Sequence, residues 1–143
     1  MKRNVIIEII CFLFIVLFFY AAGSKLLNYK AFVGQIGKSP LLTEYATWMA
    51  WLIPVTELVV VGLLVVPRWR KPGLYASFTL MALFTLYIAA ILIFTDSKDL
   101  PCSCGGVLNS LSWKQHLIFN VFFTALAWAG IHVYATEEKK QHA

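Results

Sequence analysis

Four long apolar stretches constrain this chain more than any other feature. They cover residues 5–22, 47–66, 74–94 and 117–134, and each approaches the roughly 20 residues that an α-helix needs to cross about 30 Å of hydrocarbon. Helices are predicted because an unpaired strand would leave backbone polar groups unsatisfied in lipid. Only 13% of the residues are charged, which excludes an ordinary soluble domain. We therefore predict an all-α membrane protein with a bundle of four transmembrane helices.

The first apolar stretch has some features of a secretory signal peptide, because Lys2 and Arg3 precede it and small residues follow it. Its 18 residues exceed the usual apolar core of about 7 to 15 residues in such peptides. Three further stretches follow, so we expect the first to be retained as a helix. Near its inner end, Glu8 is expected to reach the membrane interface or to pair with Arg68 or Arg70.

The distribution of basic residues predicts the orientation in the membrane. If the N-terminus is cytoplasmic, the inner segments carry seven basic residues in three short runs, and the outer segments carry five in two longer loops. The higher density of basic residues in the inner segments favours two cytoplasmic termini. Contact with anionic lipid headgroups accounts for the net charge of +5 without nucleic acid as a partner. The loop between the third and fourth stretches then faces the periplasm, if the chain lies in the inner membrane of a bacterium.

No internal repeat, low-complexity tract or long linker divides the sequence, so residues 1–143 are expected to form a single domain. The inner turn at residues 67–73 contains two prolines and a glycine, which makes the second and third helices antiparallel neighbours. Apolar residues recur at near-helical spacing within residues 26–36 of the first outer loop. Two alternatives stay open there: a short amphipathic helix at the interface, ended at Gly37, or an irregular loop with apolar anchors.

The second outer loop carries two thiols one residue apart, Cys102 and Cys104, followed by two glycines. A dithiol exchanges electrons through a thiolate, which needs access and stabilisation by a nearby cation or a helix N-terminus. The fourth helix is expected to begin about ten residues later, with Lys114 and His116 in its first turns. Three alternatives stay open: a redox-exchange pair, a structural clip, and a metal site with His116 as third ligand.

Cys11 lies too far from the loop thiols to act with them. It is about 14 residues before Lys25, which lies at the outer end of the first span, on the order of 20 Å along a helix axis. We expect a small apolar residue that packs in the bundle or faces lipid. Disulfide-forming membrane enzymes that reduce quinone, such as the vitamin K epoxide reductase and DsbB groups, use two cysteine pairs. A single pair here implies a periplasmic thioredoxin-like partner, a disulfide-containing client or a second subunit.

A carboxylate, Glu57, lies within the second apolar stretch, where an unpaired charge costs a few kcal/mol. Lys25, His116 and Asn120 are the candidate partners. His116, Asn120 and Thr124 recur at intervals of four and therefore share one helical face. The functional interpretation is a proton path or a quinone-headgroup site that includes Asn120 and Lys25. The structural interpretation is a set of interhelical hydrogen bonds.

Three segments resemble the MauE/DoxX group of redox-associated membrane proteins. They are residues 18–25 (Phe-Phe-Tyr-Ala-Ala-Gly-Ser-Lys), residues 54–57 (Pro-Val-Thr-Glu), and residues 102–106 (Cys-Ser-Cys-Gly-Gly) with the Ser-Trp at 112–113 and residues 116–120. The resemblance implies a four-helix membrane bundle. For the MauE branch it implies a role in methylamine utilisation, through maturation of the disulfide-rich small subunit of methylamine dehydrogenase. DoxX and DoxD relatives are associated with thiol or sulfur oxidation coupled to quinone.

Two functions follow as hypotheses. In the first, the protein is a component of a thiol-disulfide oxidoreductase, in which Cys102 and Cys104 react and His116 and Glu57 assist. In the second, it is a non-catalytic membrane subunit or scaffold for a redox partner, and the loop cysteines are structural.

Overall fold

A computed structural model describes residues 2–37, 43–94 and 113–142, and every regular element within these ranges is helical. The elements are α1 (Lys2–Leu27), α2 (Tyr29–Gly37), the 3-10 helix η1 (Thr43–Tyr45), α3 (Ala46–Val65), the 3-10 helix η2 (Pro67–Trp69), α4 (Arg70–Phe94) and α5 (Trp113–Gln141). Four helices, α1, α3, α4 and α5, are long and apolar enough to cross a membrane. The predicted all-α fold with four transmembrane helices is confirmed.

Two of the long helices extend well beyond the apolar stretches that predict them. Helix α1 continues to Leu27, because a single helical glycine, Gly23, costs only about 1 kcal/mol and does not end it. Helix α5 continues through the charged tail to Gln141, with Lys139 and Lys140 in its last turn. Lysines in that position interact favourably with the negative end of the helix dipole and so stabilise the C-terminal end of α5.

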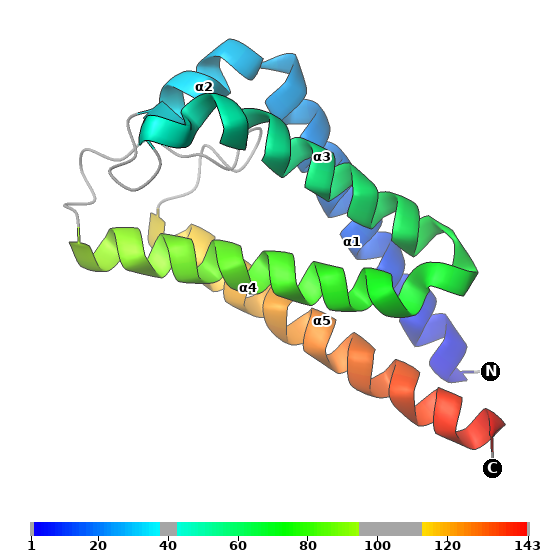
Figure 1. Ribbon diagram of the computed structural model, residues 1–143. Helices are drawn as coiled ribbons and strands as arrows, with labels where there is room; N and C mark the ends of the chain where they lie inside the picture. Colours follow the sequence, from blue (N-terminus) through cyan, green and yellow to red (C-terminus); the bar gives the residue numbers. More distant parts are fainter. Residues whose placement is uncertain (1, 38–42, 95–112, 143) are drawn as a thin grey trace.

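Helices α3 and α4 are antiparallel neighbours, as the turn sequence predicts, and η2 joins them (Figure 1). The beginning of α4 lies very close to α3. A Cβ atom on Gly73 would lie only 2.9 Å from Cδ2 of Leu64 and 3.2 Å from the carbonyl carbon of Leu63. The close approach therefore depends on the missing side chain of Gly73.

The first outer loop contains a helix, α2, so the helical alternative is the correct one. Its residue Phe32 is buried against Ala50 of α3, with Tyr29, Val33 and Met49 packed around them. The rings of Tyr29 and Trp51 lie 5.3 Å apart. This contact fixes α2 against the first turns of α3.

The four long helices form two side-by-side pairs, α1 with α3 and α4 with α5 (Figure 1). The two termini and η2 lie at one end of the bundle, which we call the terminal end. Helix α2, the end of α4 and the beginning of α5 lie toward the other end, which we call the loop end. The arrangement agrees with the prediction that both termini lie on one side of a membrane.

Ion pairs connect helices near the terminal end. Arg70 Nη1 lies 3.8 Å from Glu8 Oε1, which confirms one of the two partners predicted for Glu8. Lys71 Nζ lies 2.7 Å from Glu138 Oε2 and joins α4 to α5. These charges are partly or fully exposed, so they connect the helices at the surface of the bundle.

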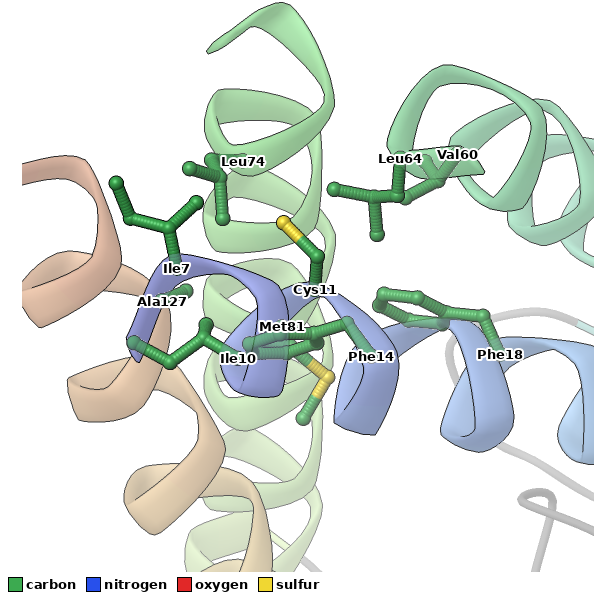
Figure 2. Close-up of a cluster of buried hydrophobic side chains, with 10 residues drawn as sticks. All are labelled: Ile7, Ile10, Cys11, Phe14, Phe18, Val60, Leu64, Leu74, Met81 and Ala127. Atoms are coloured by element: carbon green, nitrogen blue, oxygen red, sulfur yellow. The ribbon is translucent and has the colours of Figure 1, made fainter. Parts of the chain in front are cut away.

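A cluster of buried apolar side chains fills the middle of the bundle (Figure 2). Helix α1 provides half of it and faces residues of all three other long helices: the cluster comprises Ile7, Ile10, Cys11, Phe14, Phe18, Val60, Leu64, Leu74, Met81 and Ala127. Cys11 is a free, buried thiol within this cluster. It packs as a small apolar residue, in agreement with the sequence-based expectation.

Candidate functional site

A buried ion pair joins α1 to α3. Lys25 Nζ donates to Glu57 Oε1 at 2.5 Å, and the two side chains are only 4% and 1% exposed. Lys25 lies in the last turn of α1, on the same face as the buried residues Phe14 and Phe18. Glu57 lies in the buried stripe of α3, between Pro54 and Val60. Regular helical spacing therefore brings the two charges into the bundle interior.

Two aromatic rings lie close to the ammonium group of Lys25. Its Nζ is 5.8 Å from the ring centre of Phe32 in α2 and 5.5 Å from that of Phe84 in α4. Both distances lie within the roughly 6 Å over which a ring face attracts a cation. Lys25 thus contacts three other helices, α2, α3 and α4.

A small cavity adjoins this ion pair and reaches α5. Lys25, Glu57 and Asn120 provide its polar lining. Its apolar lining comes from Leu17, Phe18, Ala21, Met81, Phe84 and Phe119. The cavity leaves about 30 Å³ for the centre of a water-sized sphere. The polar groups of α1, α3 and α5 therefore meet around one space.

Two polar atoms of this site are unsatisfied. Glu57 Oε2 and Asn120 Nδ2 are buried, and neither has a hydrogen-bond partner among the residues that the structure describes. One is an acceptor and the other a donor. Since buried polar groups are nearly always hydrogen-bonded, this pair of complementary atoms stands out among the residues that the structure describes.

The polar face predicted on α5 is present. His116 is 1% and Asn120 5% exposed. Thr124, one turn further, lies with its hydroxyl oxygen 3.3 Å from that of Thr85 in α4. His116 precedes Asn120 by one turn, about 6 Å along the axis, and so lies nearer to the loop end. All four sequence-predicted residues in the described ranges, Lys25, Glu57, His116 and Asn120, are buried.

The size of the cavity limits what it can hold in this conformation. A water molecule needs about 10–15 Å³ measured in this way, so there is room for two or three. A quinone ring is several times larger than a water molecule, and the aromatic walls formed by Phe18, Phe84 and Phe119 would have to separate to admit it. The quinone site expected at Lys25 and Asn120 stays a prediction.

The two loop thiols, Cys102 and Cys104, lie outside the described residues. The helices that flank the two thiols lie within the described residues: α4 ends at Phe94 and α5 begins at Trp113. Both of these ends lie toward the loop end of the bundle (Figure 1). The alternative of a metal site, in which His116 would be the third ligand, also involves residues outside the described ranges.

The aromatic walls of the site do not follow from the sequence. Phe18, Phe84 and Phe119 come from three helices, and nothing distinguishes them from the eight other phenylalanines of the chain. A signal exists for one of them: Phe18 lies seven residues before Lys25, two helical turns away on the same face.

A family model described as "Methylamine utilisation protein MauE" matches residues 3–133. No curated protein and no solved structure matches the chain significantly. The match covers all four long helices down to residue 133 of α5, including the polar site.

Proposed function

This chain belongs to the family of the methylamine utilisation protein MauE, and we propose that it serves methylamine utilisation by thiol-disulfide exchange with a partner protein. The proposal places it in a bacterial inner membrane, with Cys102 and Cys104 on the periplasmic side. Its client would be a disulfide-containing protein such as the small subunit of methylamine dehydrogenase, or a thioredoxin-like protein that acts on it. Family membership supports the multi-pass membrane location, and the exchange chemistry is our inference.

The observation that carries this proposal is the gathering of buried polar side chains from α1, α3 and α5 inside a largely apolar bundle. Lys25, Glu57 and Asn120 line one cavity, and His116 lies one turn closer to the beginning of α5. Ionisable groups buried in a membrane protein are costly and are retained mainly for function. Only eight residues separate Cys104 from Trp113, so the thiols are tied closely in sequence to the helix that carries His116.

The proposed reaction is an exchange between a dithiol and a disulfide. A thiolate attacks one sulfur of the disulfide, a mixed disulfide forms, and a second thiolate resolves it. One S–S bond breaks for each that forms, and two electrons and two protons pass from the dithiol to the disulfide. An imidazole is the side chain whose ordinary pKa lies nearest to neutrality, and we assign His116 the role of accepting or returning a proton at the thiols. Glu57 assists by holding Lys25 and the loop end of the bundle in place.

Replacing both loop thiols tests the proposal. We expect Cys102→Ser/Cys104→Ser to leave the small subunit of methylamine dehydrogenase with free thiols, counted by mass-adding alkylation after acid quenching. Cys11→Ala is the matched control, because Cys11 is buried in the apolar cluster and should be dispensable for exchange. Full disulfide content in the double variant, at normal membrane levels, would refute exchange by these thiols.

The second hypothesis, a non-catalytic membrane subunit or scaffold, has one observation in its favour. The ion pair between Lys25 and Glu57 is direct, and a paired charge can serve helix packing alone. Under this hypothesis the double cysteine variant matures the client normally, whereas loss of the whole protein does not. A deletion strain complemented with wild type or with the double variant separates the two functions.

A further inference from the structure

The unsatisfied atoms beside the ion pair indicate that the cavity has an occupant. Glu57 Oε2 accepts hydrogen bonds and Asn120 Nδ2 donates them, and neither is satisfied by any described residue. Both residues line the same cavity, together with Lys25. A molecule in this cavity that pairs with both atoms would donate to a carboxylate and accept from an amide, which is the chemistry of a hydroxyl group.

The size of the cavity selects among molecules with a hydroxyl group. About 30 Å³ is available for the centre of a water-sized sphere, and one water needs about 10–15 Å³. A phenol ring is several times larger than the space that is available, so it would require the aromatic side chains to move. Among hydroxyl compounds, water is the one that the cavity admits as it stands.

We propose that a structural water occupies this cavity, donates to Glu57 Oε2 and accepts from Asn120 Nδ2. The ammonium group of Lys25 has three N–H donors and uses one on Glu57 Oε1, so it supplies a further donor to the same water. Three hydrogen bonds are the usual number for a buried water. The water connects α3 to α5, which extends the polar link between α1 and α3 to a third transmembrane helix. This site does not depend on the proposed thiol chemistry.

A crystal structure of the full-length protein grown from a lipidic phase, at a resolution that resolves ordered water, tests the proposal. We expect density for one water within 3.5 Å of both Glu57 Oε2 and Asn120 Nδ2, the limit for a hydrogen bond. An empty cavity, a direct bond between the two side chains, or density larger than water would each overturn it. Density larger than water would identify a hydroxyl compound of the membrane or the host as the ligand.

A substitution tests the role of the amide. Leucine has the branched outline of asparagine, is bulkier and has no donor, so Asn120→Leu should abolish the water density and leave the pair of Lys25 and Glu57 intact. Density that persists unchanged in this variant would refute a bridge through Asn120. Thr124→Val is the matched control, since Thr124 lies one turn away and is not part of the cavity lining; it should retain the water.

Nuclear magnetic resonance of the wild-type protein in lipid nanodiscs gives a second test that does not require any variant to fold. The chain has four asparagines, so selective ¹⁵N labelling yields few side-chain amide signals. The Asn120 amide should show magnetisation transfer from a long-lived water. The amide of Asn28, which is exposed and donates to the Ser24 carbonyl, is the internal control for contact with bulk water. An Asn120 signal without any transfer from water would overturn the proposal.

Discussion

Lys25 and Glu57 join the last turn of α1 to the middle of α3 through an ion pair of 2.5 Å within an apolar bundle. Glu57 is the twelfth of the 20 residues of α3, far from either end of that helix. Neither charge is exposed enough to be hydrated from the surface. Each therefore depends on the other, and this dependence can be measured.

Removing one partner of this pair should lower the free energy of unfolding far more than removing both. Lys25→Met or Glu57→Leu alone leaves a buried, uncompensated polar group, which lowers the free energy of unfolding by about 3–5 kcal/mol. The double variant Lys25→Met/Glu57→Leu should recover most of that loss. Unfolding in mixed micelles with increasing dodecyl sulfate measures the free energy of unfolding of the wild type, the two single variants and the double variant. Additive losses in the double variant would contradict the coupling.

The ion pair between Lys71 and Glu138, unlike the pair of Lys25 and Glu57, should contribute little to the free energy of unfolding. It is nearly as short, at 2.7 Å, but both side chains are substantially exposed. Exposed pairs contribute only about 0–1 kcal/mol and are screened by salt. Lys71→Met and Glu138→Leu should each change the free energy of unfolding by less than about 1 kcal/mol. The same micelle titration at low and high salt checks this, and a loss comparable to that at Lys25 would mean that the pair is buried by lipid or by a partner.

The length and spacing of apolar stretches sufficed to predict the fold, because a membrane admits few alternatives to helices. The partner of Glu57 could only be narrowed to three candidates. Lys25, His116 and Asn120 all lie on suitable faces, and the choice among them depends on helix rotation and crossing, which no local pattern encodes. The structure selects Lys25 as the ion-pair partner and brings Asn120 to the same cavity.

The aromatic walls and the close approach at Gly73 were also beyond prediction from the sequence. Each depends on contacts between residues of different helices, and the chain carries many phenylalanines and eight glycines. By contrast, Cys11 could be assigned to the apolar interior because its distance from the loop thiols follows from helix geometry alone.

Gly73→Ala should destabilise the protein, because the added methyl group would overlap Leu64 and approach the α3 backbone. Overpacking of this kind costs about 1–3 kcal/mol. Gly62→Ala is the matched control: nothing lies within 4 Å of its Cβ position, so the better helix propensity of alanine should make it neutral or slightly stabilising. Thermal unfolding of both variants in detergent provides the comparison. Equal stability of the two would show that α3 and α4 can separate at η2.

Phe14→Ala and Phe12→Ala should differ although the residues are two positions apart on α1. Phe14 is fully buried and contacts the rings of Phe18 and Phe123, whereas Phe12 is 63% exposed. In lipid, helices associate through packing contacts and not through exclusion of water. Phe14→Ala should thus lower the free energy of unfolding by an amount toward the lower end of the ~3–5 kcal/mol seen for buried phenylalanines. Phe12→Ala should change it little. Micelle unfolding distinguishes them, and similar losses would indicate that Phe12 contacts another protein.

Single cysteines at the two ends of the bundle should establish the orientation on which the exchange proposal depends. In a background with Cys11→Ala, Cys102→Ser and Cys104→Ser, we place Tyr45→Cys toward the loop end or His142→Cys at the terminal end. Both positions are exposed. A membrane-impermeant maleimide should label Tyr45→Cys on intact spheroplasts and His142→Cys only after lysis, because the basic residues favour cytoplasmic termini. The reverse pattern would place Cys102 and Cys104 in the cytoplasm, where thiols stay reduced. It would refute periplasmic exchange and leave the buried pair of Lys25 and Glu57 unaffected.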